Sequence, residues 1–231
     1  MRHPSVFIAG TDTEIGKTHV SVALLHALRA AAVDACGMKP VASGCVDTPQ
    51  GLRNTDALAL QAASSGAPSY QEVNPVALSA PVSPHLAARA DGLAIDPDAI
   101  VRAHRRLLAK HDCVVVEGIG GWLVPLDDRH TTADLVRKLD IPVLLVVGLK
   151  LGCLNHALLS ARTIEADGAR LLGWIGNRVD PDMAMAQANI DTLGHRLPVP
   201  CLGTMSHDPS AAAGPAELGK VVTLLCEGTR G

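Results

Sequence analysis

The chain has 231 residues, a formal net charge of −3 at pH 7 and 48% hydrophobic residues, which favours a folded globular protein over a disordered one. Aromatic residues make up only 2% of the chain, so side chains on which bases stack are almost absent, and there is no basic excess to hold a phosphodiester backbone. We therefore expect no nucleic-acid partner.

The six cysteines are scattered and include no C-x-x-C pair, which is typical of reduced thiols and gives no support to a metal–thiolate site. The longest strongly apolar run, Ile141 to Leu149, contains a proline and a glycine and is too short to span a bilayer. No signal-peptide pattern precedes the first apolar run. We expect a cytoplasmic protein with no membrane partner.

The first predicted element is a strand that ends at Gly10 and is followed by a polar loop and by Gly16-Lys17-Thr18 at the start of a helix. This order is typical of a phosphate-binding loop, in which backbone N–H groups face the anion, Lys17 contacts the β- and γ-phosphates and the Thr18 hydroxyl ligates Mg²⁺. Five residues separate Gly10 from Gly16 where the usual motif has four, and Thr11 takes the place of the first glycine. The alternative is a strand–loop–helix turn that carries Gly-Lys-Thr by chance.

Apolar runs and helical periodicity alternate along the rest of the chain. Residues 39–44 are predicted to form a loop because Pro40 cannot continue a hydrogen-bonded ladder, and 66–83 is predicted to be irregular. Further strands are predicted at 34–38, 113–117, 143–147, 171–175 and 199–203. Helices are predicted at 18–32, 56–65 (capped by residue 54 or 55), from 84 onward, and at 97–109, 131–139, 155–167, 183–197 and 215–226.

Strands without polar alternation, each followed by a helix, predict an α/β fold, with one domain over residues 1–231 and a mostly parallel sheet covered by helices on both faces. In such sheets, ligands bind beyond the carboxyl ends of the strands. We therefore expect the polar residues at the strand exits to face one crevice. These are residues 10–18, Lys39, Ser43, 117–121, Lys150, Gly152 and Asn177.

Glu117 follows a run of β-forming residues and precedes Gly118-Ile119-Gly120-Gly121. A carboxylate here is suited to hold Mg²⁺ directly or through water, although the usual residue is Asp, and the glycines let backbone amides approach a substrate. The alternative is an acidic residue at a strand end with no ligand. Its place between a phosphate loop and a glycine run favours the functional interpretation.

Other polar residues each admit two interpretations. Lys39 and Ser43 are suited to stabilise charge on a transferring phosphoryl group and to contact a small anion, or they belong to an ordinary solvated loop. Asp56 either joins a metal site or only complements the dipole of its helix. Asn177 either binds an adenine edge through its amide or is a turn asparagine.

Several segments together resemble the dethiobiotin synthetase family. They are Gly10–Thr18, Lys39–Gly44, Val115–Trp122 and Lys150–His156, and Leu52–Leu60 and Ser83–His85 fit as well. The match runs in the right order from Val6 to about Asn177, and the unusual spacing of the phosphate loop is itself that family's form. The resemblance implies a P-loop NTPase-like fold and an ATP-dependent cyclo-ligase of biotin biosynthesis.

In the implied reaction, 7,8-diaminononanoate and CO2 (or bicarbonate) form a carbamate on one amine. ATP phosphorylates the carbamate to a mixed anhydride, and the second amine attacks to close the cyclic urea of dethiobiotin. A carbamate is a poor electrophile until its oxygen leaves as phosphate. The protein must therefore hold carbamate and γ-phosphate in line and stabilise the developing charge.

The resemblance implies a role for each matching residue. Lys17 and Lys39 are the catalytic pair, and Thr18, Asp56 and Glu117 surround Mg²⁺. Nucleotide contacts are implied for Glu14, Ile15, Gly16, Lys17, Thr18, His19, Asp56, Glu117, Gly118, Ile119, Gly120, Asn177 and Arg178. Substrate contacts are implied for Thr11, Lys39, Ser43, Gly120, Gly121, Lys150, Gly152, Cys153, Leu154 and Asn155.

A homodimer also follows from the resemblance, with the helix start at Gly152–Asn155 of the second subunit binding the distal carboxylate of the substrate. Beyond Asn177 the match weakens. Met205–Pro209 stands where the family closes over adenine, and Glu217 is a candidate contact for the ribose or base.

Two other classes of protein share this type of loop. Partitioning or localisation ATPases carry an extra lysine at the head of the loop, where this chain has Thr11, and they usually need a membrane helix or basic surface. A cobyrinate-type amidotransferase would need a glutamine-hydrolysing domain, for which 231 residues leave no room. The partitioning switch is kept as the alternative function.

Overall fold

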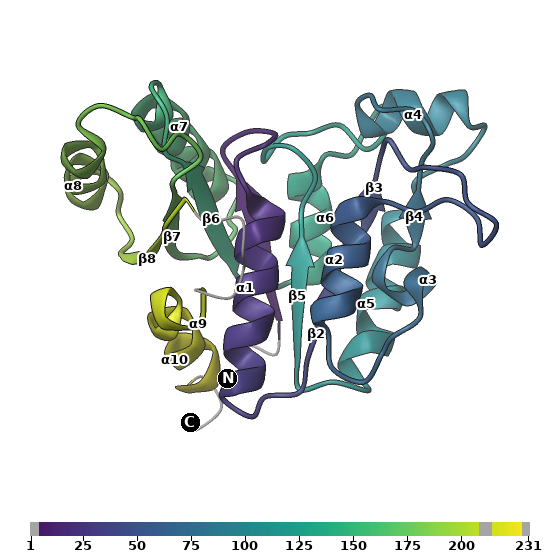
Figure 1. Cartoon of the computed structure of the whole chain (residues 1–231). Helices are drawn as coiled ribbons and strands as arrows, with labels where there is room; N and C mark the ends of the chain where they lie inside the picture. The colour runs from purple at the N-terminus through teal and green to yellow at the C-terminus, as the bar shows by residue number, and fades with distance from the viewer. Residues whose placement is uncertain (1–4, 208–213, 228–231) are drawn as a thin grey trace.

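The computed structural model describes residues 5–207 and 214–227. Six strands form one sheet in the order β2-β5-β1-β6-β7-β8, and every neighbouring pair is parallel (Figure 1). The strands are β1 (Ser5–Gly10), β2 (Ala35–Met38), β5 (Cys113–Glu117), β6 (Val143–Gly148), β7 (Leu171–Asn177) and β8 (Cys201–Met205). Every residue of β1, β2, β5 and β6 is buried, which explains why these runs lack polar alternation. The predicted α/β fold with a parallel sheet is confirmed.

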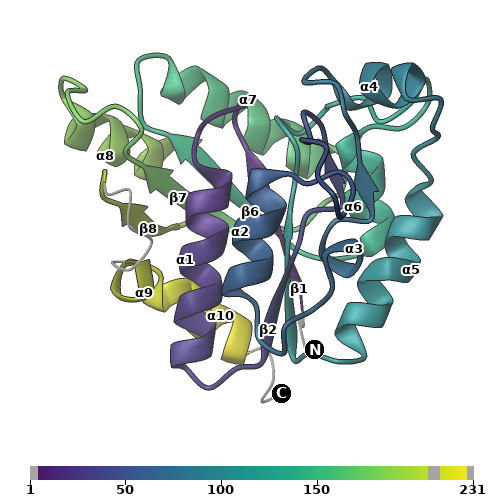
Figure 2. The same ribbon diagram turned by 45° about the vertical axis from the view of Figure 1, so that its right-hand side comes forward.

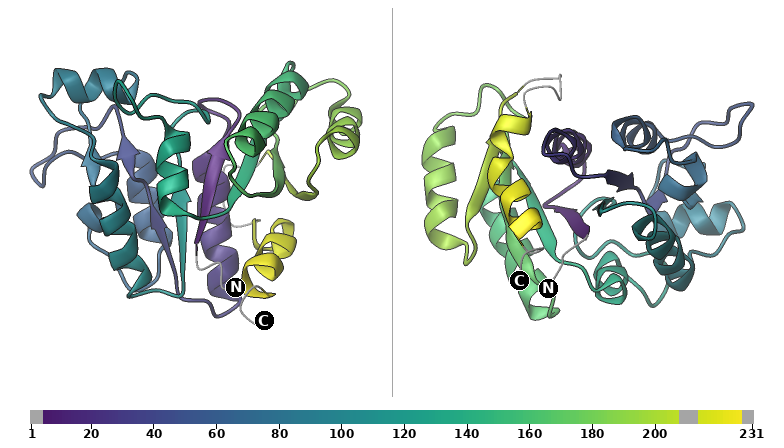
Figure 3. Two further views of the ribbon diagram at one scale, coloured as in Figure 1. Left: turned by 180° about the vertical axis from the view of Figure 1, so that it is seen from behind. Right: turned by 90° about the horizontal axis from the view of Figure 1, so that it is seen from below.

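Helices cover both faces of this sheet (Figures 2 and 3). One face carries α1 (Lys17–Ala30), α2 (Thr55–Ala63), α9 (Gly214–Glu217) and α10 (Gly219–Glu227), and the other carries α5 (Pro97–Leu108), α6 (Thr132–Leu139), α7 (Cys153–Ala166) and α8 (Ala186–Arg196). Side chains alternate across each strand, so Phe7 and Ala9 pack into one hydrophobic cluster while Val6 and Ile8 pack into the other. The sheet is therefore the shared wall of two cores.

Local helix signals are confirmed at several ends. Asn54 caps α2 by accepting hydrogen bonds from the backbone of Asp56 and Ala57, and Asp96 caps α5. Thr131 forms a capping box with Asp134 at the start of α6. A short helix, α4 (Pro84–Ala90), begins with the predicted proline. Among the described residues, no helix is long and apolar enough to cross a bilayer.

Three segments differ from the prediction. The predicted loop at 39–44 contains β3 (Val41–Ala42), which pairs in parallel with β4 (Val76–Ala77), and the predicted irregular stretch at 66–83 also contains α3 (Tyr70–Val73). Pro40 lacks a donor, but its carbonyl accepts from the Val76 N–H at 3.2 Å, so the ladder starts there. The predicted helix at 215–226 is two helices, α9 and α10.

Candidate functional site

The parallel register brings the chemically active strand ends to one edge of the sheet. Met38 of β2 lies opposite Val116 of β5, so the next residues along the chain, Lys39 and Glu117, lie side by side at the carboxyl edge of the sheet. Ile8 of β1 lies opposite Glu117, and the loop that follows β1 therefore emerges beside the same two side chains. Sequence position alone separates these residues widely, but the sheet makes them neighbours.

The loop between β1 and α1 has the backbone of an anion-binding turn. Gly16 has φ +81° and directly precedes α1, and a Cβ atom there would lie 2.0 Å from Nδ2 of Asn177. Only glycine meets both demands without strain. No described side chain caps α1, so the N–H groups of its first turn are left to face a ligand.

Lys17 folds back over the end of β1. A Cβ atom on Gly10 would lie 2.8 Å from Cδ and 2.9 Å from Nζ of Lys17, so the lysine needs a glycine beneath it. Its ammonium donates to the Asp12 carbonyl at 2.8 Å. Burial, with repulsion from Lys39 as the next contribution, lowers the pKa of Lys17 to about 8. This ammonium has few partners in the protein and is suited to receive an anion.

Lys39 has the opposite environment. Its ammonium is 2.5 Å from Glu117 Oε1, 3.2 Å from Asp56 Oδ2 and 3.1 Å from the Gly118 carbonyl, and the residue is only 4% exposed. Burial disfavours the charged form, but the two carboxylates outweigh it and raise the pKa of Lys39. Lys39 is therefore a fixed positive charge between two acids.

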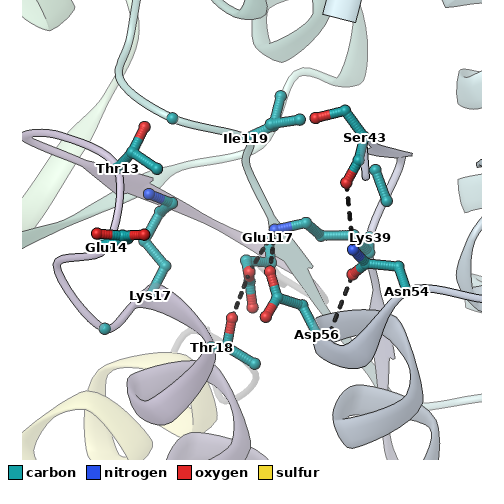
Figure 4. A pocket seen from close by; sticks show the side chains of 13 residues that line it. Thr13, Glu14, Lys17, Thr18, Lys39, Ser43, Asn54, Asp56, Glu117 and Ile119 are labelled. Carbon is teal, nitrogen blue, oxygen red and sulfur yellow. Dashed lines mark hydrogen bonds and ion pairs between the residues drawn. The ribbon is translucent and has the colours of Figure 1, made fainter. Parts of the chain in front are cut away.

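These groups line a central cavity of about 440 Å³ (Figure 4). Lys17 enters it from the phosphate loop and Lys39 from the opposite side, with Glu117 between them. Of the predicted site residues, it contains Glu14, Gly16, Lys17, Thr18, Lys39, Ser43, Asp56, Glu117, Ile119 and Gly120. Thr13, Ala42 and Asn54 also line it, and sequence reasoning did not select them as site residues. Asn54 was visible in the sequence only as a helix cap.

Thr18, Asp56 and Glu117 supply oxygen donors on one side of this cavity. The Thr18 hydroxyl donates to Glu117 Oε1 at 2.9 Å, while Glu117 Oε2 is buried and has no hydrogen-bond partner among the described residues. A buried carboxylate oxygen without a partner is costly unless a cation or ligand reaches it. A hydroxyl and two carboxylates form a donor set that suits a hard divalent cation completed by water or phosphate oxygens. No group of three His, Cys, Asp or Glu side chains in the described ranges forms a metal cluster by itself.

A second cavity, of about 350 Å³, lies on the far side of the phosphate loop. It is lined by the predicted residues Glu14, Gly16, His19, Asn177 and Arg178 and by Val179, Ser206 and His207, which the sequence analysis did not single out individually. Asn177 is 5% exposed and donates from Nδ2 to the Ile15 carbonyl at 2.9 Å. The strand exits do not all face one crevice as expected, because Lys150 and Gly152 line neither cavity, while the two cavities adjoin and share Glu14 and Gly16.

Nine predicted contact residues line neither cavity. The Thr11 N–H donates to the Val146 carbonyl at 3.1 Å, and the Gly118 N–H donates to the Ile8 carbonyl at 3.0 Å. Lys150 pairs with Asp12 at 3.5 Å. The remaining residues outside both cavities are Ile15, Gly121, Gly152, Cys153, Leu154 and Asn155. The last four form the start of α7, where Cys153 is buried and Asn155 is exposed.

The segment after β8 is only partly described. Ser206 and His207 reach the second cavity, while Asp208 and Pro209 of the predicted Met205–Pro209 closure lie outside the described residues. Glu217 accepts from the Ser206 N–H at 3.2 Å, and its Oε2 is buried without a described partner. Glu217 therefore lies beside the second cavity, although it is not part of its lining.

The chain is similar to known proteins over nearly its whole length. A family model described as an AAA domain matches residues 4–213. The chain is 54% identical over 213 residues to an ATP-dependent dethiobiotin synthetase of Xanthomonas euvesicatoria, covering 92% of this chain and 95% of the relative. It is 51% identical over 214 residues to the synthetase of Pseudomonas paraeruginosa, covering 92% and 93%.

Solved structures show the same fold at low identity. The MinC:MinD cell division protein complex of Aquifex aeolicus has a TM-score of 0.61 at 14% identity, over 96% of each chain. A ParA family ATPase from Chlorobium tepidum has a TM-score of 0.56 at 11% identity, over 97% of this chain and 94% of that one. These two neighbours share the fold alone, whereas identity above 50% over nearly the whole length identifies relatives. The chain belongs to the family of ATP-dependent dethiobiotin synthetases.

Proposed function

We propose that this chain catalyses the ATP-dependent closure of 7,8-diaminononanoate and CO2 to dethiobiotin in biotin biosynthesis. The observation that carries the proposal is the meeting of Lys17, Lys39 and Glu117 in one cavity at the carboxyl edge of the sheet. Such a site suits transfer of a phosphoryl group to a small oxyanion, because it offers a phosphate loop, a second fixed ammonium and carboxylates for a cation. The high identity to named synthetases agrees with this chemistry.

Lys17 and Lys39 divide the work in this proposal. Among the described residues the Lys17 ammonium donates to one carbonyl, that of Asp12, so it is available to the β- and γ-phosphates of ATP. Lys39 is held by two carboxylates 3.2 Å or less from its ammonium, so it acts as a preorganised charge next to the carbamate. An ammonium that is already fixed costs no reorganisation when negative charge develops on the transferring group.

The oxygen donors of Thr18, Asp56 and Glu117 are proposed to hold Mg²⁺. The fit is supported by the partnerless Oε2 of Glu117 and by the hydroxyl of Thr18 beside it. The ion would neutralise charge on the β- and γ-phosphate oxygens. The protein itself orients this edge of the cavity through the Thr18–Glu117 hydrogen bond.

The carbamate-bearing end of the diamine is proposed to contact Thr11, Ser43 and the backbone of 118–121, next to Lys39. Ser43 and Gly120 line the central cavity, and Gly121 lies close to the Gly10 carbonyl. Lys150, which pairs with Asp12, is proposed to contact the substrate as well. Of these groups, Ser43, Ile119 and Gly120 line the cavity that holds the two lysines.

The distal carboxylate is proposed to bind the start of α7 in a second copy of the chain, so the active form is a homodimer. Gly152, Cys153, Leu154 and Asn155 lie outside both cavities of their own chain, which suits a contribution to a neighbour. Leu151, at the same turn, is 96% exposed, and the proposed interface would cover it.

The second cavity is proposed to take the adenosine half of ATP. Asn177, Arg178 and His19 line it, and Glu217 lies beside it. Glu14, Ile15 and Gly16 are also proposed to contact the nucleotide, because they belong to the loop whose residues Glu14 and Gly16 line both cavities. Residues 1–231 are proposed to be one domain that works in the cytoplasm, where thiols such as the buried Cys36 and Cys113 stay reduced.

The test measures ATP hydrolysis and dethiobiotin formation with and without 7,8-diaminononanoate plus bicarbonate. Hydrolysis that depends on both substrates and yields dethiobiotin by mass spectrometry supports the proposal. Equal hydrolysis in both conditions, or stimulation by DNA or lipid vesicles instead, would overturn it. The fold shared with MinD and ParA brings no function by itself, and Thr11 stands where those switches carry their extra lysine.

A further inference from the structure

Tyr70 is the only tyrosine of the chain and lies outside both cavities. It stands at the start of α3, is 6% exposed, and its ring packs under the Arg53 guanidinium at 4.2 Å. A buried tyrosine usually gives its hydroxyl a hydrogen-bond partner. Here the hydroxyl has two: Asn54, which lines the central cavity, and Asn74, which is bonded to the backbone of the cavity residue Lys39.

The first partner is Asn54, whose backbone N–H donates to the Tyr70 hydroxyl at 2.8 Å. Asn54 caps α2, because its Oδ1 accepts from the backbone N–H of Asp56 at 3.0 Å. Its Nδ2 donates to the Ser43 carbonyl at 3.4 Å, so Asn54 connects Asp56 with Ser43 (Figure 4). By fixing the Asn54 backbone, the Tyr70 hydroxyl therefore also restrains the positions of Asp56 and Ser43.

The second partner is Asn74, which is 3% exposed and accepts from the Tyr70 hydroxyl at 2.9 Å. Its Nδ2 donates to the Lys39 carbonyl at 2.7 Å and to the Val76 carbonyl at 3.1 Å. The Lys39 N–H in turn donates to the Val73 carbonyl at 2.8 Å. The backbone of Lys39 is thus attached to α3 from both sides.

The direction of each hydrogen bond follows from donor chemistry. A backbone N–H only donates, so Asn54 must give its proton to the Tyr70 oxygen, and the phenol proton is left for Asn74 Oδ1. With its oxygen occupied in this way, the Asn74 amide must present its NH2 group to the Lys39 carbonyl. One hydroxyl therefore sets the orientation of the whole chain of contacts.

We propose that Tyr70 is a positioning residue of the phosphoryl-transfer site, whose hydroxyl sets Asp56 and Ser43 in register with Lys39. The inference rests on the proposed function for its kinetic consequence. The groups that it connects meet again inside the cavity, where Lys39 Nζ lies 3.2 Å from Asp56 Oδ2. Displacing reacting groups by as little as an ångström costs up to about a hundredfold in rate, so this outer link matters to the chemistry.

The test compares wild type with Tyr70→Phe, which keeps the ring and its contact with Arg53 and removes only the hydroxyl. The expected result is a kcat for dethiobiotin formation that is about tenfold lower, with a KM for ATP within twofold of wild type, because the phosphate loop is not part of the chain of contacts. The magnesium concentration for half-maximal binding of a non-hydrolysable ATP analogue is expected to rise, because Asp56 shifts. This second readout requires no turnover.

Ser5→Ala is the matched control. Ser5 is fully buried and shares a 2.8 Å hydrogen bond with His104. It is the first residue of β1, at the end of the strand away from the central cavity. Its loss is expected to lower Tm while leaving kcat and the magnesium requirement unchanged. The double variant of Tyr70→Phe with Asn74→Ala is expected to be no slower than the slower of its two single variants, because both remove the same link.

Wild-type kcat and magnesium requirement in Tyr70→Phe would overturn the inference, whatever happens to Tm. The positioning role would also be overturned if Tyr70→Phe and Ser5→Ala lost the same Tm and showed the same fall in kcat. If wild type makes no dethiobiotin but Tyr70→Phe still shifts the magnesium requirement of analogue binding, the proposed function fails and the positioning role stands.

Discussion

Lys17 and Lys39 line the same cavity, but their hydrogen-bond partners and the directions of their pKa shifts differ. Lys17 is held by one carbonyl, and burial lowers its pKa to about 8, whereas Lys39 is enclosed by Asp56 and Glu117, which raise its pKa despite burial. Among the described residues Lys17 forms no direct ion pair, so it gains more from an incoming phosphate than Lys39, which already forms two. The different surroundings support the binding role proposed for Lys17 and the catalytic role proposed for Lys39.

Lys39→Gln is expected to lower dethiobiotin formation at least a hundredfold. Removing the ammonium deletes charge stabilisation that acts mainly in the transition state, so affinity for an ATP analogue should stay within a few-fold of wild type. Steady-state kinetics and calorimetry measure the two quantities separately. Near-normal product formation by this variant would contradict the assigned role.

Binding of an ATP analogue is expected to take up a proton above pH 8. Lys17 is partly neutral there in the free protein, and a bound triphosphate favours its charged form. Affinity should therefore fall as pH rises through 8, by up to about tenfold per pH unit. Calorimetry at pH 8.5 in buffers of different ionisation enthalpy measures the uptake, and Lys17→Gln should abolish it.

At the scale of elements, long periodic segments and caps were predictable, and short pairings were not. Asn54, Asp96 and Thr131 begin helices through local hydrogen bonds that a sequence window contains. The two-residue strands β3 and β4 are too short to show any period, so their pairing was missed. The bond from Asn177 to Ile15 spans 162 positions, and no local pattern contains it.

The contact between β1 and α5 makes stability depend on pH. His104 shares a hydrogen bond with Ser5, and burial lowers its pKa from 6.5 to about 4. The unfolded chain therefore binds a proton more readily than the folded one, so stability present above pH 6.5 is lost as pH falls toward 4, by about 3 kcal/mol in total. Urea unfolding at pH 7 and pH 4.5 measures the loss.

His104→Gln isolates this effect, because other titrating groups act equally in both proteins. The variant is expected to lose less stability than wild type between the two pH values. An identical loss would show that His104 does not titrate in this range.

At the scale of the whole molecule, the sequence predicted which edge of the sheet carries the site but not the arrangement of the strands. Each apolar run is buried on both faces, so β1, β2, β5 and β6 are interchangeable by composition, and the order around β1 cannot be read from them. The contact of Asn177, which lines the second cavity, with the phosphate loop was also not predicted, because it joins residues 162 positions apart.

The proposed homodimer gives a prediction at this scale. Leu151→Asp places a charge at the most exposed leucine of the α7 start, so the dimer dissociation constant should rise at least tenfold and product formation should fall with it. Sedimentation velocity over a concentration series measures the constant. Leu224→Asp, at a 41% exposed position on α10, is the control and should leave assembly unchanged.

The hydrogen bond between Asn177 and Ile15 has a consequence for nucleotide affinity. The Asn177 amide donates to the phosphate loop and also lines the second cavity, so one side chain contacts both regions proposed to bind ATP. β8 pairs with β7 at Asn177, and a disturbance on that outer strand therefore has a direct route to the triphosphate. Substitutions in the edge strand β8, remote from any reacting atom, should change the affinity for ATP even where they leave the fold intact.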